Sequence, residues 1–209
     1  MFITLEGIEG CGKTTQMRLV ETWLRQRGVP CVSTREPGGT DFGRALRSVL
    51  LDPGGADRTP VPELLLYLAD RVQNLDQVVG PATRAGQWVL CDRYHDATLA
   101  YQGHGRGIPL EDIHSLAKIL KIRTPDRTVL FDLDVMTSLR RARARNRSDQ
   151  SLEAEGRFEQ EAVDFHERVR AGYLALAGAD PERFSVIDAS GNEAEVHKRV
   201  VSVLSSYVD

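Results

Sequence analysis

Residues 1–18 read MFITLEGIEGCGKTTQMR, and this stretch decides the fold. Apolar and β-branched residues at positions 2–5 favour a buried strand, and a helical pattern begins at Lys13. The turn between them has the P-loop spacing Gly-x-x-x-x-Gly-Lys-Thr, in which backbone N–H groups and a helix N-terminus form a concavity for phosphate oxygens. We therefore expect contacts to a nucleotide's phosphates from Gly7, Ile8, Glu9, Gly10, Cys11, Gly12, Lys13, Thr14 and Thr15.

Two side chains of this loop have specific predicted roles. Lys13 supplies a mobile positive charge for the β- and γ-phosphates, and the Thr14 hydroxyl is placed to bind Mg²⁺. A second metal-side group is Asp92, which follows the apolar run 88–91 and should reach the same sheet edge, binding Mg²⁺ through water. Glycine-rich turns without nucleotides occur, but Lys-Thr after a strand favours phosphate binding.

Length and charge limit what the chain can be. Its 209 residues can bury one core, so we expect a single domain spanning 1–209. A net charge of −3 argues against a general nucleic-acid binder. Three cysteines without metal-ligand spacing suggest reduced thiols in a cytoplasmic protein, and we expect neither a signal peptide nor a membrane span.

Hydrophobic periodicity predicts an α/β fold. Strands are expected at 2–5, 29–34, 88–91, 129–133 and 184–187. Helices are expected at 13–27, 43–51, 63–80, 96–101, 110–121 and 159–177, with a last helix ending near 208 and a break at 103–107. This alternation predicts a central parallel five-stranded sheet with helices on both faces.

Polar groups gather where strands of such a sheet end. The turn REPGGT at 35–40 follows the second strand, and Arg93 follows Asp92 after the third. Tyr67 and Arg71 lie four residues apart and share a helical face, so they can clamp a planar base. Taken alone, each feature also suits core packing or a solvated ion pair.

An arginine run at 140–147 precedes a polar segment at 148–156 and then Arg157. Such a run is usually a solvated face or a nucleic-acid patch, but in a phosphate-binding protein it also suits an Arg-rich lid, here about 140–158. Helical spacing cannot point all of these arginines at one phosphate. Arg143 and Arg147, four apart, can share a face toward the γ-phosphate.

Six motifs in order resemble bacterial thymidylate kinases, a family of P-loop nucleoside monophosphate kinases, over essentially the whole chain. They are LEGIEGCGKTT, TREPGGT, LLLYLADR, CDRYHDATLAYQGHGRGI, FDLDV and RFEQEAVDFHERVRAGYL. The resemblance implies a P-loop kinase fold and a Mg²⁺-dependent homodimer. It implies direct in-line phosphoryl transfer from ATP to dTMP, giving dTDP for dTTP synthesis. No general base is needed, because the attacking phosphate is already an anion.

The resemblance also implies residue roles. Glu9 would lie near the sugar 3′-hydroxyl and the reacting phosphates, and Arg93 would bridge the two phosphoryl groups. The acceptor nucleotide would contact Glu36, Arg47, Tyr67, Arg71, Arg93, Thr98, Tyr101 and Gln102. Among these, Tyr67 replaces the usual Phe that stacks on thymine, and Thr98 replaces a frequent Ser. Tyr101 would crowd a ribose 2′-hydroxyl.

In the bacterial pattern, a P-loop acid without a P-loop arginine accompanies a catalytic arginine in the lid. This sequence has Glu9 and an arginine-rich segment, which fits that pattern. We expect Arg157 to contact the donor phosphates when the lid is closed, with Arg147 as the second choice. The position before Arg157 is Gly156, where the family usually has Asp.

Two other functions stay open. A kinase for a different nucleoside monophosphate can share the fold and the P-loop. A P-loop ATP-binding switch can dock nucleic acid through the arginine run, but it would not need the sets Tyr67/Arg71 and Thr98/Gln102.

Overall fold

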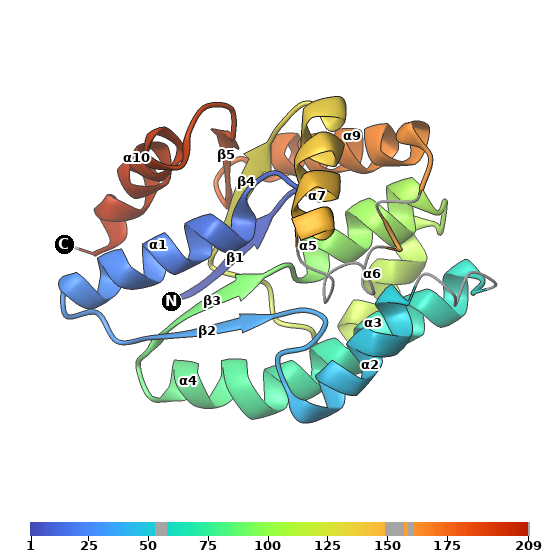
Figure 1. The fold of residues 1–209 in the computed structure, drawn as a ribbon. Helices are drawn as coiled ribbons and strands as arrows, with labels where there is room; N and C mark the ends of the chain where they lie inside the picture. Colours follow the sequence, from blue (N-terminus) through green and yellow to red (C-terminus); the bar gives the residue numbers. More distant parts are fainter. Residues whose placement is uncertain (53–57, 149–156, 159–160, 209) are drawn as a thin grey trace.

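A computed structural model describes residues 1–52, 58–148, 157–158 and 161–208, and for Arg147 and Ser148 it describes only the backbone. Its centre is one parallel sheet in the order β2-β3-β1-β4-β5. The strands are β1 (Phe2–Glu6), β2 (Cys31–Arg35), β3 (Trp88–Asp92), β4 (Arg127–Asp132) and β5 (Phe184–Asp188). The predicted five-stranded parallel α/β fold is confirmed, with the P-loop after the central strand (Figure 1).

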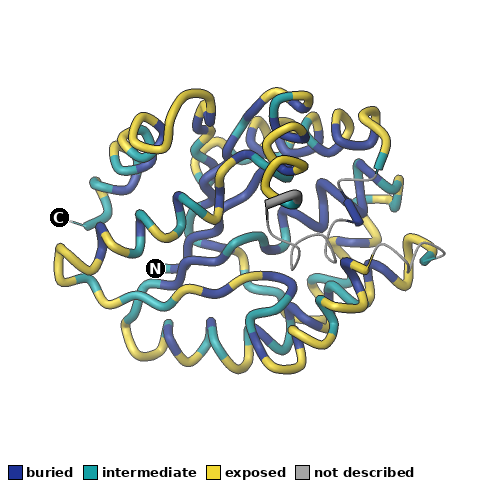
Figure 2. The backbone as a smooth tube through the Cα atoms, in the orientation of Figure 1, coloured by how far each residue is buried: buried dark blue, intermediate teal, exposed yellow. Residues whose placement is uncertain are grey.

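Helices cover both faces of the sheet. The residues of the central strands β1, β3 and β4 are largely buried between them, whereas the edge strands β2 and β5 are only partly buried (Figure 2). The helices are α1 (Lys13–Gln26), α2 (Asp41–Leu51), α3 (Pro60–Asn74), α4 (Gly80–Arg84), α5 (His95–Thr98), α6 (Leu110–Ile119), α7 (Val135–Ser148), α9 (Val163–Ala179) and α10 (Glu193–Leu204). The described residues also form two π-helical segments, η1 (Leu75–Val79) and η2 (Leu99–Gly105), and a 3₁₀ turn, η4 (Ser205–Tyr207).

Alternate side chains of β1 pack on opposite faces of the sheet. Ile3 and Leu5 pack with α1 and α10 through Leu24 and Val200. Phe2 packs on the other face with Val79. All five residues of β1 are buried, which is the burial expected of a parallel strand covered on both sides.

Several predicted boundaries are wrong. The second strand begins at Cys31 and not at Val29, because the Val29 N–H donates to the carbonyl of Leu24 and so belongs to the end of α1. The predicted helix 63–80 begins earlier, at Pro60, and its axis continues through η1 into α4. The long helix α9 begins at Val163; residues 159–160 of its predicted start lie outside the described residues.

The predicted glycine break at 103–107 is also wrong in its first part, because η2 continues to Gly105. A Cβ on Gly105 would lie 2.7 Å from a ring carbon of Phe165, and one on Gly103 would collide with Leu110. These glycines therefore allow η2 to pack closely against α6 and α9 rather than ending the helix.

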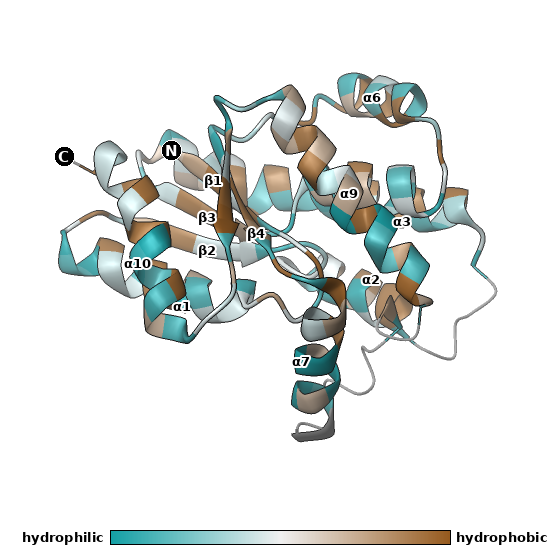
Figure 3. Cartoon of the chain, turned by 90° about the horizontal axis from the view of Figure 1, so that it is seen from above, coloured by the Kyte–Doolittle hydropathy of each residue, from teal (hydrophilic) through white to brown (hydrophobic). Residues whose placement is uncertain are grey.

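Among the described residues, no helix is long and apolar enough to cross a bilayer. The surface of α7 is strongly hydrophilic, and Figure 3 shows it projecting from the body of the molecule. Its buried side, with Val135, Leu139 and Ala142, packs onto the core.

Candidate active site

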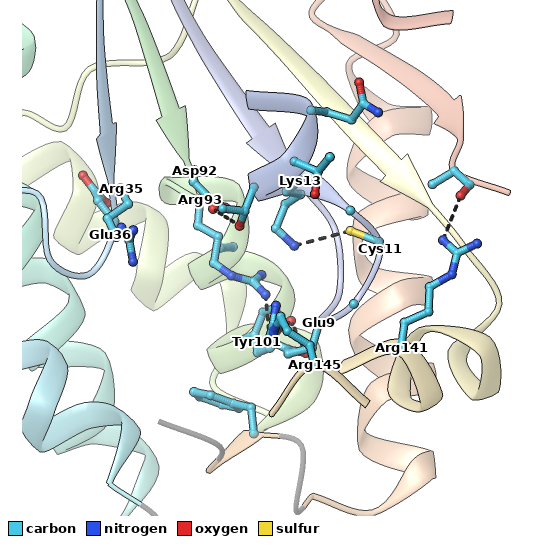
Figure 4. A pocket seen from close by; sticks show the side chains of 18 of the residues that line it. Glu9, Cys11, Lys13, Arg35, Glu36, Asp92, Arg93, Tyr101, Arg141 and Arg145 are labelled. Carbon is cyan, nitrogen blue, oxygen red and sulfur yellow. Dashed lines mark hydrogen bonds and ion pairs between the residues drawn. The ribbon is translucent and has the colours of Figure 1, made fainter. Parts of the chain in front are cut away.

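A cavity of about 750 Å³ opens at the carboxyl ends of the strands (Figure 4). It joins the P-loop to α3, to the segments after β2 and β3, to α7 and to the loop after β5. The predicted residues that line it are Glu9, Gly10, Cys11, Gly12, Lys13, Thr14, Thr15, Glu36, Arg47, Tyr67, Arg71, Asp92, Arg93, Thr98, Tyr101 and Gln102. Gly7 and Ile8 line a second, small cavity with residues of β4 and α9 instead.

The P-loop curls tightly between β1 and α1. Gly10 has a φ of 77°, and a Cβ there would collide with the carbonyl of Ser138 on α7, so only glycine fits. The Lys13 ammonium is buried and donates to the carbonyls of Gly7 at 2.8 Å and Ile8 at 2.9 Å. Lys13 thus points back into its own loop, where its charge faces the space enclosed by the backbone.

The two predicted metal-side groups meet. Thr14 Oγ1 donates to Asp92 Oδ2 at 3.1 Å. The contact places the hydroxyl beside the carboxylate, so the hydroxyl would bind Mg²⁺ directly and the carboxylate would bind it through water, as the sequence predicts. Hydroxyl and carboxylate oxygens are also the ligand types that Mg²⁺ prefers.

Arg93, Glu9 and Tyr101 form a connected corner of the cavity. Arg93 donates to Glu9 Oε1 at 2.7 Å and to the carbonyl of Gly7 at 2.9 Å. The Tyr101 hydroxyl lies 2.7 and 2.8 Å from the two Glu9 oxygens and donates to the carboxylate. Burial alone would raise the pKa of Glu9, but Arg93, His166 and Lys13 together lower it below its ordinary value.

The part of the cavity that is predicted to take the acceptor nucleotide is built around a buried ion pair. Arg71 donates to Glu36 at 2.6 Å, to Thr98 Oγ1 at 2.8 Å and to the carbonyl of Tyr94 at 2.9 Å. Asn74 donates to the other oxygen of Glu36 at 2.9 Å. Burial raises the pKa of Glu36 to about 7, although Arg71 opposes the rise. Arg71 is thus held rigidly at the wall of the cavity.

Sequence reasoning missed Glu63, which is fully buried and collects several donors. Gln102 donates to it at 2.9 Å, and Arg157 pairs with it at 2.7 Å. Arg106 joins the group at 3.3 Å. Arg157 therefore lies against α3 and is not among the residues that line the cavity. No local signal marks Glu63, because its partners come from distant parts of the chain.

Sequence reasoning also missed Glu6 and Asn74. Glu6 accepts from Tyr94 N–H at 2.7 Å and from the Tyr173 hydroxyl at 2.8 Å, beneath the turn that carries Arg93. Burial and the nearby Asp96 raise the pKa of Glu6 to about 7. Asn74 had a usable signal, since it lies three residues after Arg71 and shares its helical face.

Two arginines of α7 contribute to the wall of the cavity. Arg141 and Arg145 line the cavity, and Arg143 is not among the lining residues, although all three are exposed. Arg141 donates to the carbonyls of Ala189 at 3.3 Å and Gly191 at 3.4 Å. That Arg143 and Arg147 share a face toward the γ-phosphate stays a prediction. The side chain of Arg147 and residues 149–156 lie outside the described part of the chain.

The sequence of the chain matches known proteins over almost its whole length. A sequence model of the family described as thymidylate kinase matches residues 5–200. The thymidylate kinase of Desulfosudis oleivorans is 50% identical over 210 residues, covering 100% of this chain and 98% of that protein. The thymidylate kinase of Desulfovibrio desulfuricans is 49% identical over 209 residues, covering 100% and 96%.

The fold agrees with these sequence matches. The crystal structure of thymidylate kinase from Ehrlichia chaffeensis superposes with a TM-score of 0.77 at 33% identity, covering 98% of each chain. A match over the full length, at half identity and with the same fold, leaves one assignment. The chain belongs to the thymidylate kinase family.

Proposed function

We propose that this protein transfers the γ-phosphoryl group of ATP to dTMP and releases dTDP and ADP. One observation carries the proposal. A single cavity contains the P-loop at one end and the set Tyr67, Arg71, Thr98 and Gln102 at the other. A switch that only hydrolyses ATP has no use for the second end. An enzyme that joins two nucleotides needs both ends in line.

At the donor end, the P-loop residues from Gly7 to Thr15 would hold the phosphates of ATP through backbone N–H groups. We infer that Lys13 exchanges the carbonyls of Gly7 and Ile8 for phosphate oxygens when ATP binds. Thr14 and Asp92 would hold Mg²⁺, as their 3.1 Å contact supports. Mg²⁺, when bound, neutralises charge on the β- and γ-phosphates.

At the acceptor end, Tyr67 would stack on thymine while Arg71 and Thr98 bond its edge. The Arg71–Thr98 contact of 2.8 Å supports a shared role, because the bond orients both groups. Gln102 lines the same wall. Glu36 would act through Arg71, with which it pairs, and Arg47 would approach the acceptor from α2. Tyr101 and Glu9 would contact the deoxyribose.

Catalysis would rest on cations between the two ends. Arg93 is the best-supported of these, because it already bridges the P-loop carbonyl of Gly7 and the acid Glu9. Arg145 lines the cavity and adds a candidate from α7. Arg157 remains our predicted lid arginine, with Arg147 second. For Arg157 this role requires leaving its 2.7 Å partner Glu63.

We also propose a cytoplasmic homodimer in which the 209 residues act as one domain. The three cysteines are free thiols, which suits a reducing compartment. Phe42 and Val49 are exposed on one face of α2, and Val61 and Leu65 are exposed on one face of the adjacent α3. Apolar side chains gathered on two packed helices suit an interface with a second copy.

The direct test is dTMP-dependent formation of dTDP from labelled ATP, with and without Mg²⁺. Lys13→Ala should lower turnover at least ~100-fold, as the loss of one preorganised donor does elsewhere. Lys118→Ala, on the exposed surface of α6, is the matched control and should keep full activity. A folded Lys13→Ala protein with near-normal turnover would remove the P-loop from the mechanism.

A further inference from the structure

His166 on α9 is a fully buried histidine, 0% exposed, that lies beside Glu9 and helps to lower the pKa of that carboxyl. Its ring lies between two segments far apart in sequence. Nε2 is 2.9 Å from the carbonyl oxygen of Phe158, and Nδ1 is 3.5 Å from Glu9 Oε2 in the P-loop. The ring also packs against the Phe165 ring, with centroids 5.5 Å apart and planes at 87°.

The bonding partners fix how this ring is used. A carbonyl oxygen only accepts, so Nε2 carries the hydrogen that faces Phe158. Nδ1 is buried and makes no hydrogen bond within the described part of the chain, although it faces the Glu9 carboxylate. Buried polar atoms seldom stay unpaired. Because the Glu9 carboxylate only accepts, closing the 3.5 Å gap pairs it with Nδ1 when this nitrogen carries a hydrogen as well.

Both partners of His166 also contact Tyr101. Glu9 accepts from the Tyr101 hydroxyl, at 2.7 Å for its nearer oxygen. The Phe158 ring packs edge-on against the Tyr101 ring, with centroids 5.3 Å apart and planes at 86°. Tyr101 is thus held at its hydroxyl by one partner of His166 and at its ring by the other.

We propose that His166 is a positioning residue that ties Glu9 to Phe158 and so fixes Tyr101 against the sugar of the acceptor nucleotide. It touches neither substrate itself. Its contribution is to hold the ring whose place decides whether a 2′-hydroxyl fits. The inference rests on the proposed function, since it assigns the sugar side of that acceptor site.

Three substitutions separate this role from simple core packing. His166→Asn keeps an amide near the position of Nδ1, toward Glu9. His166→Gln keeps an amide near the position of Nε2, toward the carbonyl of Phe158, and His166→Ala keeps neither. His114→Asn, exposed on α6, is the control. The measurements are kcat and KM for dTMP, the same constants for the ribose analogue of dTMP, and the melting temperature.

The sugar preference is the ratio of kcat/KM for dTMP to kcat/KM for its ribose analogue. In the Ala variant this ratio should fall ~10-fold, and in the Asn variant it should lie within ~3-fold of the wild-type value. An unchanged sugar preference with a lower melting temperature would overturn the proposal, as would equal narrowing in Ala and Asn. If the Ala variant does not fold, the proposal requires Asn to keep a higher preference than Gln. A wild type without dTMP kinase activity would instead contradict the proposed function.

Discussion

At the residue scale, the proposed acceptor side depends on Arg71, which is almost completely buried and donates to Glu36, Thr98 and a backbone carbonyl. Its guanidinium is held before any nucleotide arrives. Preorganised groups of this kind avoid the cost of ordering at the moment of binding. Under the proposed function, recognition of the acceptor and stability of the fold depend on the same side chain.

Arg71→Ala should lower the free energy of unfolding by ~3 to 5 kcal/mol, because it leaves Glu36 buried without its cation. Urea denaturation measures this loss. Arg25→Ala, which breaks an exposed pair with Glu21, is the control and should change stability by no more than ~0.5 kcal/mol. Equal, small losses in both variants would show that the buried pair does not hold the site together.

Glu6 supports the turn that carries Arg93, the proposed catalytic arginine. Arg93 has a φ of 68°, in the left-handed region that non-glycine residues rarely adopt, and Glu6 accepts the next N–H, that of Tyr94, at 2.7 Å. This bond stabilises the turn from which Arg93 reaches Glu9. Glu6 is thus part of the site although it does not line the cavity.

Glu6 should also make stability depend on pH. Its pKa rises from 4.5 to about 7 on folding, so the folded state holds the proton more tightly than the unfolded chain. Stability therefore falls as pH rises through this window, by up to ~3 kcal/mol. Denaturation of the wild type and Glu6→Gln at pH 5 and pH 8 checks this. Parallel pH dependences in the two proteins would exclude the effect.

At the element scale, close packing of η2 on α9 brings Tyr101 to the P-loop. Gly172 of α9 makes the contact possible, since a Cβ there would lie 2.6 Å from the His104 ring. Side chains on the two segments then form the aromatic group of Tyr101, Phe165 and Tyr173. The π-helix η2 continues through Gly103 and Gly105, and these two glycines allow it to pack closely on its neighbours.

Gly172→Ala should destabilise the protein by ~1 to 3 kcal/mol through overpacking. Gly178→Ala in the same helix has nothing within 4 Å of the new Cβ and should stabilise it by up to ~1 kcal/mol. Thermal melts of the two variants make a matched pair. Stabilisation in both variants would show that the space between η2 and α9 accommodates a Cβ at position 172, which would contradict the close packing.

The sequence predicts strands and the P-loop well because their signals are local. Buried runs such as 88–91 and the Gly-Lys-Thr spacing need no knowledge of distant residues. The cavity-facing side of α7 could not be assigned, because it depends on where Leu139 and Ala142 meet the core. Glu63 and His166 were missed for the same reason, since only the folded chain brings their partners to them.

At the scale of the whole molecule, the cavity exists because five strands end at one edge of the sheet. Segments as distant as the P-loop and the loop after β5 meet there. Catalysis by positioning needs this arrangement, because the two nucleotides react only when both ends are filled and aligned.

The proposed homodimer should be sensitive to charge on α2 and α3. Leu65 is 51% exposed and Phe42 is 48% exposed, so replacing either by Glu should not harm the core. Each variant should elute as a monomer in size-exclusion chromatography with light scattering, where the wild type elutes at twice the chain mass. Val186→Glu, on the edge strand β5, should stay dimeric. A monomeric wild type would refute the dimer.

The central claim is that both ends of the cavity serve one reaction, and acceptor choice tests it most directly. Steady-state ADP release should be measured with dTMP, dUMP, UMP, dCMP and dGMP, and without any acceptor. We predict the highest kcat/KM for dTMP and negligible turnover when the acceptor is absent. Preference for another nucleoside monophosphate, or ATP hydrolysis that ignores the acceptor, would contradict the account.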